Sequence, residues 1–181
     1  MEKTPENIHA TSVRVTDSVD KEQTRLPQLD EKNRKRYYGF RIGELGLLAL
    51  PESHSECLRN YRIYPVPNTH PWFRGMINLR GDLLPVFDLD RLLFPDNEAL
   101  DRQIILVLDK GEHAVGIVVE DYPCAIDGLQ PLSSIPSIPE LFRGHCLSAY
   151  ATPGSVWVEF NHRSFFYSLS TKIPVVSQVH Q

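Results

Sequence analysis

Short apolar segments separated by turn residues dominate the chain from residue 37 onward. Residues 38–42 alternate between apolar and polar or small positions, which is the period of a half-buried strand. Residues 104–108 form a continuous apolar run of strand length, which predicts burial on both faces. A turn at 109–112 leads into residues 114–119, where Gly116 indicates a bulge or a close backbone approach. These segments predict neighbouring strands.

Strands also dominate the rest of the predicted elements, and helical periodicity is scarce. Two short helical turns are predicted, one over 72–80 with Pro71 at its first position and Gly81 just past its end, and one over 140–142. Many short strands with Gly/Pro-rich connections favour an all-β fold of the barrel type, because closure removes exposed edges. The further predicted strands cover residues 45–50, 63–66, 156–160 and 165–169.

The polar composition of the two ends sets the predicted domain limits. Residues 1–35 are rich in Thr, Ser, Asp, Glu, Lys and Gln, and they carry too little apolar surface to offset the entropy of ordering. We therefore predict a flexible polar tail there. Residues 36–172 hold the strand pattern and form one predicted domain, and residues 173–181 form a C-terminal tail.

The charge balance argues against a general nucleic-acid binder. The formal net charge is -4 and the pI is near 6.0, whereas such a binder usually shows a high pI and a basic face. A local basic patch is still present in the charge run at residues 31–36. Two interpretations stay open: a solvated linker, or a contact for an acidic partner or a nucleic acid, with Tyr37 and Tyr38 as a stacking surface.

The cysteine pattern and the short apolar runs are typical of a protein of the reducing cytoplasm. Cys57, Cys124 and Cys146 are odd in number and widely spaced, which is a poor disulfide framework. No signal-peptide pattern is visible, and the apolar runs are far shorter than a membrane span. We expect a cytoplasmic protein without direct membrane insertion, so any membrane association would run through a partner.

Residue patterns for catalysis, cofactors and metals are missing from the sequence. The seven histidines are scattered without the paired spacing of zinc sites, and no serine lies in a nucleophile-elbow context. Asp88 and Asp90, and Glu120 and Asp121, are interpreted as solvated carboxylates at strand ends. We predict no catalytic residue, no cofactor and no metal.

The segment from Gly75 to Asp88 has the character of a rigid corner. Gly75 lets another backbone or a ring come close, and Asn78 can bond to nearby backbone groups. Gly81 can take a left-handed conformation. Pro85 cannot donate to a sheet ladder, which predicts an edge or a bulge where another chain could add.

Arg80 is the candidate contact residue of this corner. Its planar fork of five donors can hold a partner carboxylate or several carbonyls at once. The alternative is structural: Arg80 caps carbonyls of its own turn, or pairs with Asp82 or Asp88.

At these residues the chain resembles the CheW-like family, the coupling proteins of bacterial chemosensory systems. The resemblance is densest in the corner and extends to Phe40-x-Ile42-Gly43, Val66-Pro67 and Val115–Val119. The corner carries it through Gly75, Asn78-Leu79-Arg80-Gly81, Pro85-Val86 and Asp88-Leu89.

This resemblance implies two intertwined five-stranded SH3-like β-barrels without catalytic activity. It also implies an adaptor that bridges the cytoplasmic tips of methyl-accepting receptors to the regulatory domain of a CheA-type histidine kinase, recruited to membrane-bound receptor arrays. No nucleic-acid partner is expected; the alternative function is a small β-barrel nucleic-acid-binding protein. The implied partner-binding residues are Gly75, Asn78, Leu79, Arg80, Gly81, Pro85 and Asp88.

The C-terminal third departs from the usual pattern of chemotaxis couplers, which finish with a strand, an aspartate-leucine pair and a helix. Here residues 155–160 lead to Asn161-His162 and then to the aromatic residues 165–167. This ending and the long N-terminal tail are more similar to the couplers of type IV pilus twitching motility. The output, flagellar or pilus, stays open from sequence.

Overall fold

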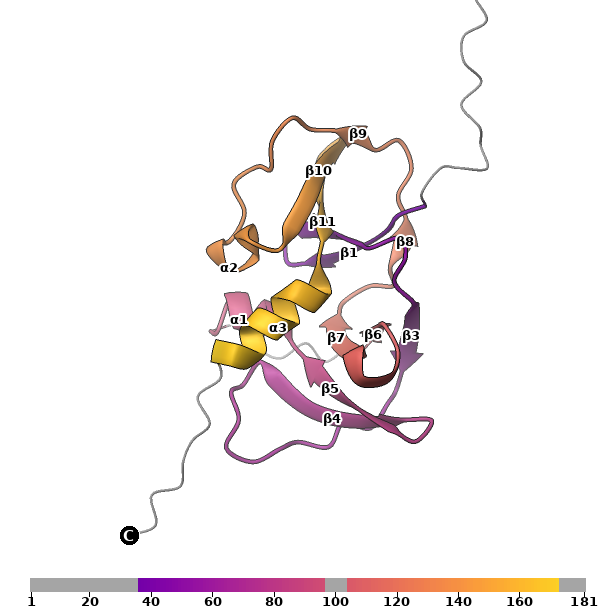
Figure 1. The fold of residues 1–181 in the computed structure, drawn as a ribbon, viewed down its shortest axis with the longest axis vertical. Helices are drawn as coiled ribbons and strands as arrows, with labels where there is room; N and C mark the ends of the chain where they lie inside the picture. Colours follow the sequence, from indigo (N-terminus) through magenta and orange to yellow (C-terminus); the bar gives the residue numbers. More distant parts are fainter. Residues whose placement is uncertain (1–35, 97–103, 173–181) are drawn as a thin grey trace, which may run out of the picture. The chain divides into compact units, whose positions relative to one another are not determined.

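The computed structural model describes residues 36–96 and 104–172. The predictions for the tails 1–35 and 173–181 lie outside these residues. Strands predominate, and they form two curled sheets accompanied by short helices, which confirms the predicted all-β class (Figure 1).

The first sheet is built from the two ends of the domain. Its strand order is β8-β1-β2-β11-β10-β9, and β11 pairs with β2 in parallel. The outermost strands, β8 and β9, have two residues each. The bounds are β1 Tyr38–Ile42, β2 Leu45–Ala49, β8 Cys124–Ala125, β9 Gln130–Pro131, β10 Cys146–Thr152 and β11 Ser155–Phe160.

The second sheet uses the middle of the chain, so the two sheets are intertwined in sequence as predicted. Its order is β3-β6-β7-β5-β4, which makes β3 and β4 its edge strands. The bounds are β3 Ser55–Arg59, β4 Phe73–Leu79, β5 Asp82–Phe87, β6 Ile104–Leu108 and β7 Val115–Val119. The helices are α1 Leu89–Leu93, the 3-10 turn η2 Gly111–His113, α2 Glu140–Arg143 and α3 His162–Lys172.

The strand β6 contributes side chains to two hydrophobic clusters. All five of its residues are buried, as its continuous apolar run predicted. Leu106 and Leu108 belong to a hydrophobic cluster that includes residues of both sheets, whereas Ile105 and Val107 belong to a cluster within the second sheet. Because successive side chains of a strand point to opposite faces, β6 supplies two cores at once.

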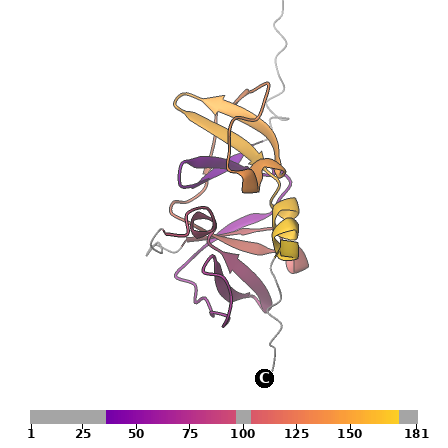
Figure 2. The same ribbon diagram turned by 90° about the vertical axis from the view of Figure 1, so that its left-hand side faces the viewer.

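The last helix packs against both sheets. The ring centroid of Phe166 lies 4.6 Å from that of Phe87 in β5, and the ring centroid of Phe165 lies 5.2 Å from that of Phe160 in β11. Figure 2 shows α3 running along one side of the strands. The helix therefore joins the end of the first sheet to the face of the second.

The prediction of a strand over 165–169 was wrong, and so was the expected departure from an ending with a helix. Phe165, Phe166 and Leu169 are buried on one face of α3, which is a helical spacing. The Asn161 side chain accepts a hydrogen bond from the Ser164 N–H at 3.1 Å, which caps the first turn. This cap and the aromatic packing outweigh the strand preference of three consecutive aromatic residues.

The predicted helix over 72–80 was also wrong, because residues 73–79 form β4. Gly75, Ile77 and Leu79 are buried in alternation with Met76 and Asn78, which is the period of a strand. The long-range pairing of β4 with β5 decides the conformation. The short turn predicted at 140–142 is present as α2.

Candidate partner-docking site

The residues Arg80 and Gly81 form the turn of the β4–β5 hairpin. They lie between the paired residues Leu79 and Asp82, and their φ angles are 56° and 100°. Two consecutive positive φ values match the right-handed twist of the flanking strands. The Asn78 Oδ1 accepts a hydrogen bond from the Gly81 N–H at 3.0 Å. Asn78 and Gly81 thus make the local contacts expected of them, but they shape a hairpin and end no helix.

This turn exposes the Arg80 side chain, which is 73% accessible, at the end of the hairpin. Its guanidinium binds the Glu56 carboxylate of β3 with both terminal nitrogens, at 3.1 and 2.9 Å. These hydrogen bonds raise the pKa of Arg80 further above its ordinary value. The alternative pairing with Asp82 or Asp88 was therefore wrong.

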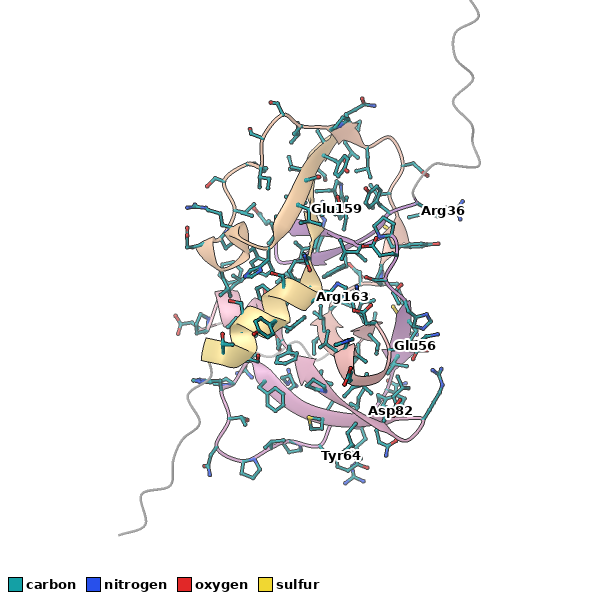
Figure 3. The ribbon with its side chains drawn as sticks, in the orientation of Figure 1. Arg36, Glu56, Tyr64, Asp82, Glu159 and Arg163 are labelled. Atoms are coloured by element: carbon teal, nitrogen blue, oxygen red, sulfur yellow. The ribbon has the colours of Figure 1, made fainter. Side chains whose placement is uncertain are left out.

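The Arg80–Glu56 pair connects the hairpin to the far edge of its own sheet. The strands β3 and β4 lie at opposite ends of the strand order. Figure 3 shows Glu56 on β3 and Asp82 at the start of β5. A planar fork held at two points presents its remaining N–H donors in a fixed orientation, which suits recognition of a carboxylate or of carbonyl groups.

A cavity of about 230 Å³ lies beside this pair. Its lining is mixed: Glu56, Arg80, Asp109 and Lys110 contribute charge, while buried residues such as Leu84 contribute apolar surface. The hairpin also exposes Leu83, which is 67% accessible and opposite Asn78 in register. An apolar side chain beside an arginine is a common combination at protein interfaces. We name Asn78, Arg80, Gly81 and Leu83 the hairpin tip.

Three other predicted site residues lie inside the molecule and support the hairpin. Leu79 is buried in the core of the second sheet. A Cβ on Gly75, whose φ is 127°, would lie 2.1 Å from the Tyr64 carbonyl oxygen, so only glycine allows this close approach. Asp88 is 1% exposed, so its interpretation as a solvated carboxylate was wrong; it accepts a hydrogen bond from the Arg91 N–H at the start of α1 and pairs with Arg74 at 3.0 Å.

The prediction that Pro85 marks an edge holds locally, because Pro85 pairs on one side only, although β5 as a whole is not an edge strand of its sheet. Its strand β5 lies between β7 and β4, and Pro85 pairs with Met76 of β4. The β7 ladder begins only at Val86, so the missing N–H of Pro85 interrupts none of that ladder's pairs. The register irregularity lies in β4, between Phe73 and Gly75.

Sequence reasoning missed Glu56 and Leu83. Glu56 is 24 residues from Arg80, and no local spacing signals a contact over that distance. Leu83 follows a segment that the sequence predicts to be a helix ending before Gly81, so no strand register was available to predict its exposure. A hairpin register would have revealed its exposure opposite Asn78.

The nucleic-acid alternative loses part of its predicted surface. Tyr37 is buried against Leu48 and Trp157, and its hydroxyl lies 3.1 Å from the Tyr150 hydroxyl. Burial and this hydrogen bond raise the pKa of Tyr37. Tyr37 is therefore unavailable for stacking on a base. The basic residues at positions 34 and 35 lie outside the described residues, and Tyr38 is exposed.

Metal-binding clusters and membrane-spanning helices are both missing from residues 36–96 and 104–172. Within these ranges, no group of three or more His, Cys, Asp or Glu side chains is arranged to hold a metal ion. In the same ranges, no helix has the length and apolar character needed to cross a membrane.

Comparisons with known proteins place these observations in a family. The family model described as the CheW-like domain matches residues 36–145. The chain is 31% identical over 87 residues to Protein FrzA of Myxococcus xanthus, covering 48% of this chain and 54% of FrzA. It is 31% identical over 84 residues to Protein PilI of Pseudomonas aeruginosa, covering 46% of this chain and 47% of PilI.

Shorter or more distant matches agree with these. The Chemotaxis protein CheW of Bacillus subtilis is 39% identical over 57 residues, which cover 31% of this chain and 36% of that protein. The chain thus spans about half the length, or less, of these curated relatives. The crystal structure of the scaffolding protein TtCheW from Thermoanaerobacter tengcongensis matches with a TM-score of 0.53 and 20% identity, over 70% of this chain and 88% of that one. At this identity the likeness shows the fold.

Proposed function

Because the chain belongs to the CheW-like domain family, we propose that it is a non-enzymatic adaptor that couples methyl-accepting receptors to a CheA-type histidine kinase. It acts in the cytoplasm, where receptor arrays recruit it. The receptor's cytoplasmic tip and the kinase's regulatory domain are its partners, and neither a nucleic acid nor direct membrane insertion is part of this role. The similarity to PilI supports an output in type IV pilus twitching motility, and the similarity to CheW supports one in chemotaxis.

The observation that carries the proposal is the hairpin tip. It presents one oriented guanidinium and one exposed leucine on a two-residue turn whose backbone is fixed by the Asn78 side chain. Little ordering entropy is lost when such a preformed turn binds a partner. Arg80 would donate hydrogen bonds to carboxylate or carbonyl oxygens of the partner, and Leu83 would supply apolar contact area.

The buried residues of the motif have a supporting role in this proposal. Gly75 allows the segment at Tyr64 to pack on β4, and Tyr64 exchanges two backbone hydrogen bonds with Met76, at 2.8 and 2.9 Å. Leu79 and Pro85 stabilise the hairpin through packing and pairing, and Asp88 fixes the chain where it enters α1. These four residues would therefore affect partner binding through the position of the tip.

The test is a reconstitution with the organism's own receptors and histidine kinases. The full chain is titrated into receptor membranes and kinase, and kinase autophosphorylation and co-sedimentation are measured. We expect Arg80→Ala to weaken capture of at least one partner by about tenfold or more, as for a residue at an interface hot spot. Arg80→Lys should also lose capture, because an ammonium cannot reproduce the planar fork.

The matched control is Arg143→Ala. Arg143 also pairs with a glutamate at the surface, Glu140, and its side chain is 62% exposed. It lies on α2, away from the hairpin in the chain, so its removal should leave capture unchanged. Equal capture by folded Arg80→Ala and wild-type protein would refute the role of the tip, and failure of the wild-type chain to link any receptor to any kinase would refute the coupling function.

A further inference from the structure

A buried polar cluster connects the two sheets at the start of α3. Asp109 follows β6 of the second sheet with a φ of 66°, and its N–H donates to the His54 carbonyl at 2.8 Å. His162 and Arg163 follow β11 of the first sheet. Figure 3 shows Arg163 at the beginning of α3. Residues 53 and 54 positions apart in sequence are thus brought into direct contact.

Both α3 residues bind the same carboxylate. The His162 Nε2 lies 2.7 Å from the Asp109 Oδ2, and the Arg163 Nε–H donates to that same oxygen at 2.6 Å. The second Asp109 oxygen accepts from an Arg163 NH2 group at 2.7 Å. His162 and Asp109 are only 1% and 6% exposed, so water screens this contact poorly.

The charges of Asp109, His162 and Arg163 sum to zero when His162 is neutral. Arg163 is protonated at every relevant pH, so its positive charge already compensates the Asp109 carboxylate. Uptake of a proton at the His162 Nδ1 would add a second positive charge. That atom is buried, and among the described residues it has no hydrogen-bond partner, so the new N–H would lack an acceptor.

The other charged group that acts on His162 is Glu52, in the connection between β2 and β3. Its carboxylate and that of Asp109 favour the protonated ring, whereas Arg163 opposes it. Burial has the largest influence, and it lowers the pKa of His162 below its ordinary value of 6.5. The ring is therefore neutral at neutral pH, with the proton on Nε2 directed at Asp109.

We propose that Asp109, His162 and Arg163 form a clamp that holds the first turn of α3 against the end of β6, and that the clamp opens when the His162 Nδ1 takes up a proton. Opening releases the end of α3 that carries Phe165 and Phe166, which pack on the two sheets. It also changes the wall of the cavity beside Arg80, because Asp109 lines that cavity. The clamp is a pH-sensitive connection between the C-terminal helix and the hairpin surface.

The direction of the pH effect follows from proton binding. The unfolded chain, with a histidine pKa of 6.5, binds this proton more readily than the folded chain does. The contribution of the neutral ring to stability is thus complete above pH 6.5 and is lost as the pH falls through 6.5 toward the folded-state pKa. One proton allows the unfolding equilibrium constant to rise by up to about tenfold for each pH unit in this window.

The experiment compares the full-length wild type with His162→Gln and the control His113→Gln, whose ring is 71% exposed. The glutamine amide of the first variant can still donate to Asp109, but it does not titrate. Unfolding by denaturant is measured at about pH 7.5 and about pH 5.5. The wild type and His113→Gln should lose stability at the lower pH more strongly than His162→Gln does. The same pH dependence in all three proteins would overturn the proposal.

Two measurements on the wild type test the clamp even when His162→Gln does not fold. NMR titration of the His162 ring should give a midpoint below 6.5, and a ring protonated above that pH would refute the clamp. Amide hydrogen exchange, corrected for its intrinsic pH dependence, should become faster in α3 as the ring titrates while β6 and β7 stay protected. Unchanged protection of α3 through the titration would also refute it.

Discussion

Two arginine–carboxylate pairs in this molecule have the same chemistry and different surroundings. Arg163 binds Asp109 with two nitrogens, and Arg80 binds Glu56 with two nitrogens. The Asp109 side chain is 6% exposed, whereas that of Glu56 is 22% exposed. The first pair joins α3 to β6, and the second ends at a solvent-exposed hairpin tip.

The difference shows that the burial of the carboxylate decides whether a pair contributes mainly to folding stability or is available for binding a partner. A buried carboxylate that loses its partners leaves unsatisfied hydrogen-bonding groups in a medium that cannot replace them. At the surface, water replaces a lost partner at little cost, and such pairs contribute little to folding. The exposed pair is accordingly the one that can exchange its contacts with another protein without loss of the fold.

The largest expected effect is on the pair whose carboxylate is buried, Arg163–Asp109. Asp109→Ala should lower the free energy of unfolding by about 3–5 kcal/mol, because it removes the acceptor of both His162 and Arg163. Glu56→Ala should leave the unfolding midpoint almost unchanged. Denaturant titrations of both variants at neutral pH measure the contrast, and equal losses would remove the distinction between the two pairs.

Asp88→Ala provides an intermediate case. Asp88 is 1% exposed and binds Arg74, and it also caps α1 through the Arg91 N–H at 3.1 Å. Loss of the cap and of the charged hydrogen bond should cost about 2–3 kcal/mol of unfolding free energy. The prediction fails if the variant is as stable as the wild type in the same titration.

Acid should weaken the Arg163–Asp109 pair by an amount comparable to that predicted for Asp88→Ala. Arg163 holds the pKa of Asp109 at about 2, against 3.8 for the free side chain. The ionised carboxylate therefore contributes about 2 kcal/mol above pH 3.8, and this is lost as the pH falls toward 2. In the His162→Gln background, whose residue 162 does not titrate, unfolding curves with and without Asp109→Asn should converge as the pH falls through this window, and a constant difference between them would contradict the assignment.

The smallest effect on stability is expected when the two residues of the exposed pair, Arg80 and Glu56, are exchanged for one another. The double variant Arg80→Glu with Glu56→Arg restores opposite charges at the same two positions, so the unfolding midpoint should stay near that of the wild type. Capture of receptor or kinase should remain impaired, because the guanidinium no longer occupies the tip. Full recovery of capture would mean that the charge pair matters and its orientation does not.

The sequence was most informative where a motif is local. Asn78-Leu79-Arg80-Gly81 indicated the family and the exposed arginine, and the continuous run 104–108 predicted a strand buried on both faces. It was misleading where one spacing fits two structures. Trp72, Met76 and Arg80 are four residues apart, as in a helix, yet Gly75, Ile77 and Leu79 have the alternation of a strand that pairs with β5.

Contacts between distant segments were beyond sequence reasoning. Glu56 lies 24 residues from Arg80, and Asp109 lies 53 residues from His162. No local pattern encodes these pairs, because they depend on the order of strands in the sheets. The helix α3 was missed for a related reason: its aromatic residues favour a strand locally, and the packing of Phe166 on Phe87 of β5 becomes visible only in the fold.

The parallel pairing of β2 with β11 has a consequence for biosynthesis. The ribosome releases β2 early, but its partner strand ends at Phe160, after all five strands of the second sheet. A chain emerging from the ribosome can thus assemble β3 to β7 while β2, already able to pair with β1, still lacks its second neighbour β11. During that interval one edge of β2 has no partner strand, and Leu48 lacks its packing partner Trp157 of β11.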